Sequence, residues 1–209
     1  MILMVVVCLA AGCSRTVTPI VTYGEQMAVE VTLRGNVDAG SNGYFMVLSA
    51  DPNYKIPLPW PNQIDAAPEM LEPGTTPLIG SIEAYYSNFY NSWSGYVLLE
   101  PAGYTLVKGP FVLGQSATRE YLSPPGAASS KLTFLVRLGS LYSTIPDKIY
   151  FDFVSVPWIG GSAKIPKDHL PSTNNYISKV TGSIVEVTEF EEASIEASLD
   201  ILKVKIEVQ

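Results

Sequence analysis

Apolar and polar residues alternate along several short segments of this chain, which is typical of β-strands that bury one face. In residues 27–34 the apolar side chains occupy every second position, and residues 148–156 alternate in the same way. Residues 44–50 are apolar almost without a break, which predicts a central strand buried on both faces. Shorter stretches of similar character predict further strands at residues 95–100, 104–113, 117–122, 131–138, 183–190 and 196–208.

The last of these segments, residues 196–208, changes its alternation part-way. Its apolar residues up to Ile201 occupy odd positions, whereas Val204 and the apolar residues after it occupy even positions. A β-bulge near Leu202 would repair this shift, because a bulge adds one residue to one strand of a pair. A helix over residues 191–202 is the alternative, since Glu and Ala favour helices.

Two long proline-rich segments separate the strands. Residues 57–77 and 157–175 contain repeated prolines, which lack the amide donor that the middle of a sheet requires. We expect both segments to be loops, and loops of this length are often functional. The pattern as a whole predicts an all-β fold, an antiparallel β-sandwich of about eight or nine strands with two long Pro-rich loops.

The order of these segments resembles sandwich domains of the DOMON and carbohydrate-module type. The resemblance lies in the apolar strand at residues 44–50, the proline-rich excursion, the region at 93–100 and the strand at 148–156. It covers most of the chain and is one of pattern rather than of a diagnostic motif. It implies a β-sandwich.

The N-terminus carries the most specific motif of the sequence. An apolar stretch runs into Leu9-Ala10-Ala11-Gly12-Cys13, which resembles a bacterial lipobox. The resemblance implies a cleaved signal peptide and a lipidated, newly N-terminal Cys13 that carries acyl chains such as palmitate. Ser14 after this cysteine implies sorting to the outer membrane if the host is diderm. The apolar stretch is too short to span a bilayer, which takes about 20 residues.

The motif departs from the usual lipobox in two respects. No basic residue precedes Arg15, and Ala10 rather than a leucine lies three places before the cysteine. A start assigned too late would explain the missing basic region, and a buried N-terminal strand around Val6 is the alternative. We expect a signal peptide at residues 1–12, a lipidated tether at 13–26 and a β-sandwich domain at 27–209.

Composition and charge limit the partners and the chemistry. The chain is 47% hydrophobic, which is enough for a substantial core, and its net charge of −7 argues against nucleic acid or anionic lipid as a partner. Its two cysteines are Cys8, inside the signal, and Cys13, so the mature domain is left without a thiol for a disulfide or a metal. We expect no metal site and no cofactor.

Catalytic motifs are scarce. His169 is the single histidine, it lies between Pro166 and Pro171 in a predicted loop, and no Gly-x-Ser-x-Gly nucleophile motif occurs. An ordinary surface histidine is therefore preferred over a catalytic one. Glycoside hydrolysis needs two carboxyls that face a cleft, and the carboxyls that border strands or aromatic runs are Glu83, Glu100, Asp147 and Asp152.

Aromatic residues form the strongest candidate for ligand binding. Five of them recur at helical spacing between residues 83 and 93, and two tryptophans lie in the long loops. Such rings suit sugar or peptide surfaces, and packing against the sandwich core is the alternative. The candidate ligand-binding residues are Trp60, Tyr85, Tyr86, Phe89, Tyr90, Trp93 and Trp158.

These observations predict a lipid-anchored protein of the cell envelope, held on the extracytoplasmic side. The first hypothesis is a module without enzymatic activity that binds a glycan or an envelope protein or has a structural role. The second is a carboxylate-dependent hydrolase that acts on envelope glycans.

Overall fold

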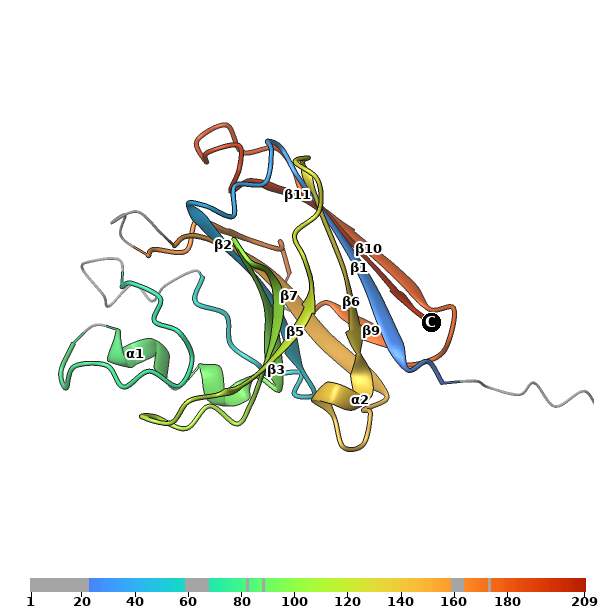
Figure 1. The fold of residues 1–209 in the computed structure, drawn as a ribbon, viewed down its shortest axis with the longest axis horizontal. Helices are drawn as coiled ribbons and strands as arrows, with labels where there is room; N and C mark the ends of the chain where they lie inside the picture. Colours follow the sequence, from blue (N-terminus) through green and yellow to red (C-terminus); the bar gives the residue numbers. More distant parts are fainter. Residues whose placement is uncertain (1–22, 59–67, 82, 88, 159–163, 173) are drawn as a thin grey trace, which may run out of the picture.

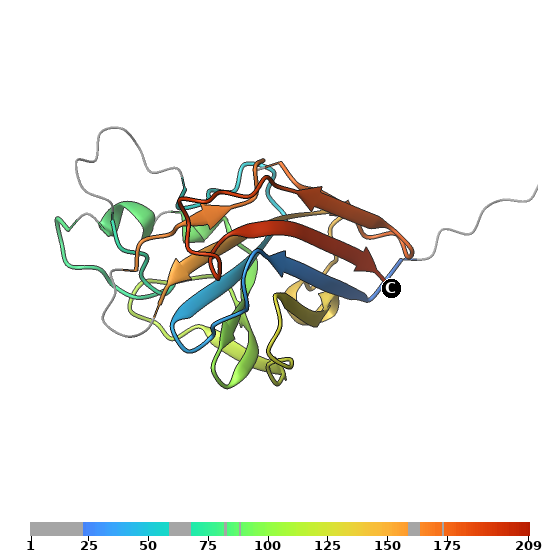
Figure 2. The same cartoon turned by 90° about the horizontal axis from the view of Figure 1, so that it is seen from above.

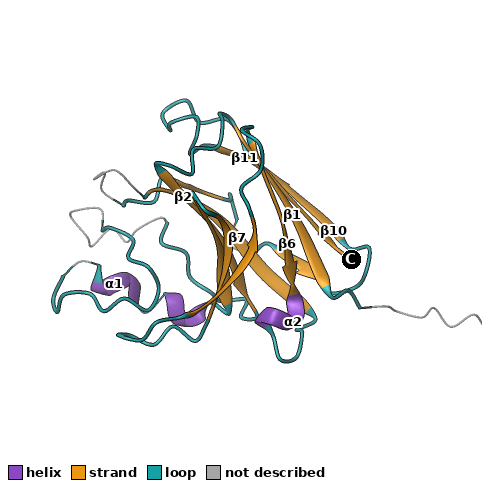
Figure 3. Cartoon of the chain, viewed as in Figure 1, coloured by secondary structure: helices purple, strands orange, loops and turns teal. Residues whose placement is uncertain are grey.

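The computed structural model describes residues 23–58, 68–81, 83–87, 89–158, 164–172 and 174–209. Cys13 and Trp60 lie outside the described residues. Within the described part the chain forms two antiparallel sheets that pack face to face as a β-sandwich (Figure 1). Strands account for most of the regular structure, as Figure 3 shows, and the predicted fold class is confirmed.

The smaller sheet has four strands in the order β10, β11, β1 and β6. The larger sheet has the path β5, β4, β3, β2, β7 and β8, with β9 also paired to β7. The strands of the smaller sheet are β1 (Gln26–Leu33), β6 (Lys131–Arg137), β10 (Ile184–Thr188) and β11 (Ile201–Val208). Those of the larger sheet are β2 (Asn42–Ser49), β3 (Gly95–Glu100), β4 (Gly103–Lys108), β5 (Thr118–Ser123), β7 (Lys148–Pro157), β8 (Asp168–His169) and β9 (Tyr176–Ser178).

Every segment predicted as a strand contains one, and two short strands were not predicted. β8 and β9 fall within or just after the segment 157–175 that was predicted to be a loop. Both strands pair with β7. This pairing makes them strands, although their own sequences show no strand pattern. In the parts of the chain that the structure describes, the helical elements are α1 (Ala84–Ser87), the 3-10 helix η1 (Tyr90–Ser92) and α2 (Leu138–Leu141). Within the described residues, no helix is long and apolar enough to span a membrane.

The predicted β-bulge is present in β11. Thr32 of β1 pairs with Lys203 and Leu33 pairs with Ile201, so Leu202 is the extra residue. This insertion lets Ile201 and Val204 both point into the core although their spacing is odd. The alternative helix over residues 191–202 is wrong, because that segment consists of turns before β11 begins.

The central strands of the larger sheet are buried on both faces, which gives the protein two cores. Its inner face packs against the smaller sheet through alternate residues such as Met46 and Phe153. Its outer face carries a second core that includes Phe45, Tyr96 and Val154. The chain segments between β2 and β3 and after β4 fold over this outer face, and every residue of β2 is consequently buried.

The two ends of the molecule differ in character. β1 begins at the same end as the C-terminus, whereas the loops around α1 lie at the opposite end in both views (Figure 1, Figure 2). Tyr23, which precedes β1, forms an isolated bridge with Val180. The end where the chain joins the sandwich is therefore remote from the segments that carry most of the predicted aromatic site.

Candidate functional site

The predicted aromatic residues lie mostly in the second core. Tyr86, Phe89, Tyr90 and Trp93 are each less than a tenth exposed, and Trp158 is half-buried. Tyr85 alone among the described members of the set is largely accessible, at 43% exposure. In this conformation four of the rings cannot offer a face to a ligand, and their contact with a ligand stays a prediction.

Contacts of these rings account for their burial. The Trp93 ring lies edge-on to Tyr90 with centroids 4.9 Å apart, and its Nε1 donates a hydrogen bond of 2.7 Å to the Lys55 carbonyl. Trp158 packs edge-on against Phe45 at 4.9 Å. Burial also raises the pKa of Tyr86 to about 12, so its hydroxyl stays protonated at physiological pH. The rings thus join the segment 54–93 to the outer face of the larger sheet.

The structure brings together a group of ionisable residues that the sequence did not connect. Asp152 on β7 is fully buried, and its Oδ2 lies 3.3 Å from Nδ1 of His169 on the neighbouring strand β8. Its Oδ1 accepts hydrogen bonds from the backbone N–H groups of Phe153 and Leu170. The sequence placed His169 in a loop as a surface residue, but pairing of β8 with β7 makes it a partly buried partner of Asp152.

Burial and the interaction between the two residues have opposite effects on the pKa values of Asp152 and His169. Complete burial raises the pKa of Asp152, against the three hydrogen bonds that favour its ionised form. Burial alone would lower the pKa of His169, but the hydrogen bond and charge of Asp152 raise it. Two backbone N–H groups and the His169 ring thus converge on the Asp152 carboxyl.

Asp168 and Glu189 extend this group toward the smaller sheet. The Asp168 carboxyl accepts a hydrogen bond of 2.7 Å from the backbone N–H of Ile201, which links β8 to the start of β11. Burial, with a further contribution from the Asp200 charge, raises the pKa of Asp168 to about 6. Burial, followed by the charge of Asp168, raises the pKa of Glu189 to about 7. Two carboxyls thus keep protons at a pH at which ordinary carboxyls are ionised.

Asp200, whose charge acts on Asp168, forms an ion pair with Arg34. Arg34, which follows β1, donates from Nε to Asp200 Oδ2 at 2.5 Å, and Asp200 is 1% exposed. The backbone N–H of Glu192 donates to the same oxygen at 3.2 Å. A buried carboxylate next to a guanidinium is stable only as a pair, so these residues fix the turns before β11 to the end of β1.

The chemistry open to this group is proton transfer, because a carboxyl with a pKa near neutrality can act as a general acid or base. Within the described part of the chain, no group of histidine, cysteine and carboxylate side chains has the arrangement that would hold a metal ion. Asp152, Asp168, His169 and Glu189 line none of the five hollows described for this structure.

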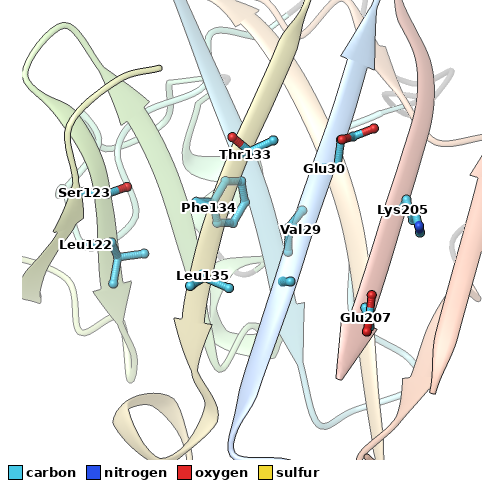
Figure 4. A pocket seen from close by; sticks show the side chains of 10 residues that line it. Val29, Glu30, Leu122, Ser123, Thr133, Phe134, Leu135, Lys205 and Glu207 are labelled. Carbon is cyan, nitrogen blue, oxygen red and sulfur yellow. The ribbon is translucent and has the colours of Figure 1, made fainter. Parts of the chain in front are cut away.

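A hollow of about 500 Å³ lies on the outer face of the smaller sheet and extends to β5 (Figure 4). Its lining includes the apolar residues Ala28, Leu122 and Leu135 and the charged residues Glu30, Lys205 and Glu207. Lys131 pairs with Glu30 at 2.8 Å and holds the pKa of this carboxyl below its usual value. The aromatic residue among those that line this hollow, Phe134, is only 6% exposed, so it offers little ring surface of the kind that binds sugars.

A second hollow, of about 550 Å³, contains two carboxyls. Asp38 and Glu196 line it together with Lys167, Asn42 and polar backbone. The Glu196 carboxylate accepts a hydrogen bond of 2.8 Å from the Ser198 hydroxyl, which itself accepts one from the Asn42 side chain. The residues that line this hollow include no aromatic side chain.

Exposed aliphatic side chains gather at the end of the molecule remote from the start of β1. Ile79 is 98% exposed and Leu78 is 81% exposed, and Val112 and Leu113 are about half exposed on the neighbouring loop. The two loops are joined by a hydrogen bond of 2.9 Å from the backbone N–H of Gly114 to the carbonyl of Gly74. Aliphatic side chains this exposed on adjacent loops are typical of contact sites for other macromolecules.

Comparison with protein-family models, with curated protein sequences and with solved structures found no match to this chain. The resemblance to DOMON and carbohydrate-module sandwiches therefore stays a prediction about family.

The sequence identified only one carboxyl of the buried group around His169. Of the sequence candidates, Asp152 belongs to the buried group, whereas Glu100 pairs with Arg119 at 2.8 Å and Asp147 pairs with Lys179 at 2.8 Å. Glu83 takes part in neither of the two carboxyl groups described above. Asp168 and Glu189 were missed, because only the pairing of β8 with β7 and the end of β10 brings them near Asp152.

Proposed function

We propose that this chain is a lipid-anchored protein of the cell envelope without enzymatic activity, which presents the loop-bearing end of its sandwich to a partner. The lipobox-like segment that ends at Cys13 supports the anchor. An acylated Cys13 would leave about ten residues of tether before Tyr23, where the described chain begins.

The observation that carries this proposal is the opposite placement of the tether side and the exposed loops. β1 begins at one end of the sandwich, and the loops that carry Leu78, Ile79, Val112 and Leu113 extend from the other (Figure 1). An anchored domain with this geometry holds its exposed aliphatic side chains away from the membrane. They are then accessible to soluble or membrane-bound partners.

A protein is the preferred partner over a glycan. Sugar-binding surfaces rely on exposed flat rings, whereas Tyr86, Tyr90 and Trp93 are buried in the second core. Aliphatic side chains at loop tips are instead suited to the apolar centre of a protein interface. Glycan binding is retained as the competing outcome.

Photo-crosslinking in cells tests the choice of surface and partner. A photoreactive residue in place of Ile79 in the full-length protein should give a discrete crosslinked adduct with another envelope protein, because this side chain is 98% exposed at the loop-bearing end. Adducts are measured as mass-shifted bands identified by mass spectrometry.

Phe190 provides the matched control, since it is 94% exposed but lies beyond the end of β10 in a different part of the surface. Crosslinks of equal yield from positions 79 and 190 would mean that the loops have no special role. Binding of the unmodified protein to a glycan array, abolished by Leu78→Ser with Ile79→Ser, would replace the protein partner by a glycan.

A carboxylate-dependent hydrolase is the second candidate, and the raised pKa of Glu189 is the observation that favours it. Hydrolysis of a glycan also needs two carboxyls in one cleft. The carboxyls whose pKa values are raised to about 6 and about 7, Asp168 and Glu189, are not among the residues that line the hollow with the two carboxyls Asp38 and Glu196. This separation supports the binding function over catalysis.

A further inference from the structure

We propose that the end of the sandwich where the tether joins it docks onto the surface of the membrane that holds the anchor. This proposal rests on the proposed lipid anchor at Cys13 and names a second partner, the lipid surface, for a different part of the molecule. The docking surface is the tether-side patch, which we define as Tyr23, Lys148, Tyr176, Lys179 and Ile184.

The patch is continuous around the point where the chain joins the sandwich. Tyr23 bridges to Val180, and the backbone N–H of Gly24 donates to the carbonyl of Lys179 at 2.9 Å. Lys179 Nζ lies 4.5 Å from the centre of the Tyr23 ring. These contacts fix the first described residue of the chain against the loop between β9 and β10.

The other members of the patch lie on the adjacent strands. Lys148 Nζ lies 4.1 Å from the centre of the Tyr176 ring, on paired strands β7 and β9. Tyr176 and Ile184 line a common hollow of about 500 Å³ between β9 and β10. Tyr23 and Ile184 are each 58% exposed and Tyr176 is 44% exposed, so the apolar members are accessible.

The side-chain types match the interface between lipid and water. Tyrosine places an apolar ring and a polar hydroxyl across this boundary, and lysine keeps its ammonium group in water while its stem covers apolar surface. One of the two lysines, Lys179, is neutralised by Asp147 at 2.8 Å. The patch therefore suits the headgroup region of a bilayer through its rings and Ile184 more than through net charge.

The short tether makes the bilayer the surface that the tether-side patch would contact. A segment of about ten residues reaches at most about 35 Å. A domain of this length is roughly 40 Å across. The tether therefore keeps the patch next to the bilayer and the loop tips away from it. Attachment through Cys13 also holds the patch at a high local concentration next to the bilayer, which favours docking through weak contacts.

Depth-dependent quenching tests this proposal on the full-length acylated protein. The protein is reconstituted in vesicles of phosphatidylethanolamine and phosphatidylglycerol that contain lipids with nitroxide groups. A fluorophore is attached through Ile184→Cys or, as the matched control, through Phe190→Cys. The two positions lie toward opposite ends of β10, and acylation leaves Cys13 unavailable for labelling.

We expect the label at position 184 to be quenched at least threefold more strongly than the label at position 190. Tyr176→Ser, an exposed substitution on the neighbouring strand, should reduce the quenching at 184 at least twofold while the circular dichroism stays unchanged. Equal quenching at 184 and 190 of an acylated protein would overturn the patch and leave the anchor standing. A chain that mass spectrometry finds without an acyl group would overturn the anchor, and the patch proposal would fall with it.

Discussion

Replacing Trp93 by alanine lowers the free energy of unfolding by about 3–5 kcal/mol, which is the usual cost of removing a large buried aromatic side chain. Trp93 is 3% exposed, packs edge-on against Tyr90 at 4.9 Å and donates its indole N–H to the Lys55 carbonyl. The substitution removes all of these contacts from the second core. Denaturant unfolding followed by circular dichroism measures the change without relying on tryptophan fluorescence.

Two matched variants separate packing from ligand binding. Tyr85→Ala, a neighbouring ring that is 43% exposed, should cost no more than about 1 kcal/mol. Trp93→Phe keeps an aromatic ring and loses the hydrogen bond, so it should cost about 1–3 kcal/mol. If Trp93→Ala unfolds like the unaltered protein but loses a ligand, the second core would have to be reinterpreted as a binding site.

Raising the pH from 5 to 8 lowers the stability of this protein, and Glu189→Gln removes part of that loss. Asp168 and Glu189 have pKa values raised to about 6 and about 7 in the folded state. Above pH 4.5 the folded chain therefore holds protons that the unfolded chain has released, so its stability falls as the pH rises. The raised pKa of His169 acts in the same direction, because its contribution is complete below pH 6.5 and is lost as the pH passes the folded-state value.

The expected loss is about 2 kcal/mol, because Asp168 is only 7% exposed and contributes most of it, whereas Glu189 is partly exposed and water screens much of its interaction. Glu189→Gln should raise the melting temperature at pH 8 and change it little at pH 5. Glu186→Gln, on the exposed side of β10 where Glu186 lies 3.6 Å from Lys203, serves as the control and should shift the melting temperature by a similar small amount at both pH values. A stability that rises from pH 5 to pH 8 would contradict the protonated state of Asp168 and Glu189.

Fold class was predictable because the hydrophobic pattern records which face of a strand is buried. The continuous apolar run at β2 correctly predicted burial on both faces, and the change of parity near Leu202 correctly predicted a bulge. β8 was missed because it is two residues long and lies between prolines, so its own sequence has too few positions to show alternation. Its existence depends on the long strand β7 beside it.

The candidate sites were less predictable because their definition depends on contacts between distant segments. Rings at helical spacing between residues 83 and 93 give the same sequence pattern whether they are exposed or buried. Their burial is decided by the way this segment folds over β3 and β7. Likewise, Asp168 and Glu189 acquire raised pKa values chiefly because the fold buries them, and neighbouring carboxyls on separate segments add to the shift.

Mass spectrometry of the N-terminus of the protein isolated from its native membranes is the most direct test of the central claim, that this sandwich is held to the cell envelope through Cys13. The account predicts a chain that begins at Cys13 and carries a diacylglyceryl thioether with an acylated amino group. A chain that retains Met1, or a Cys13→Ala variant that remains membrane-bound, would contradict it.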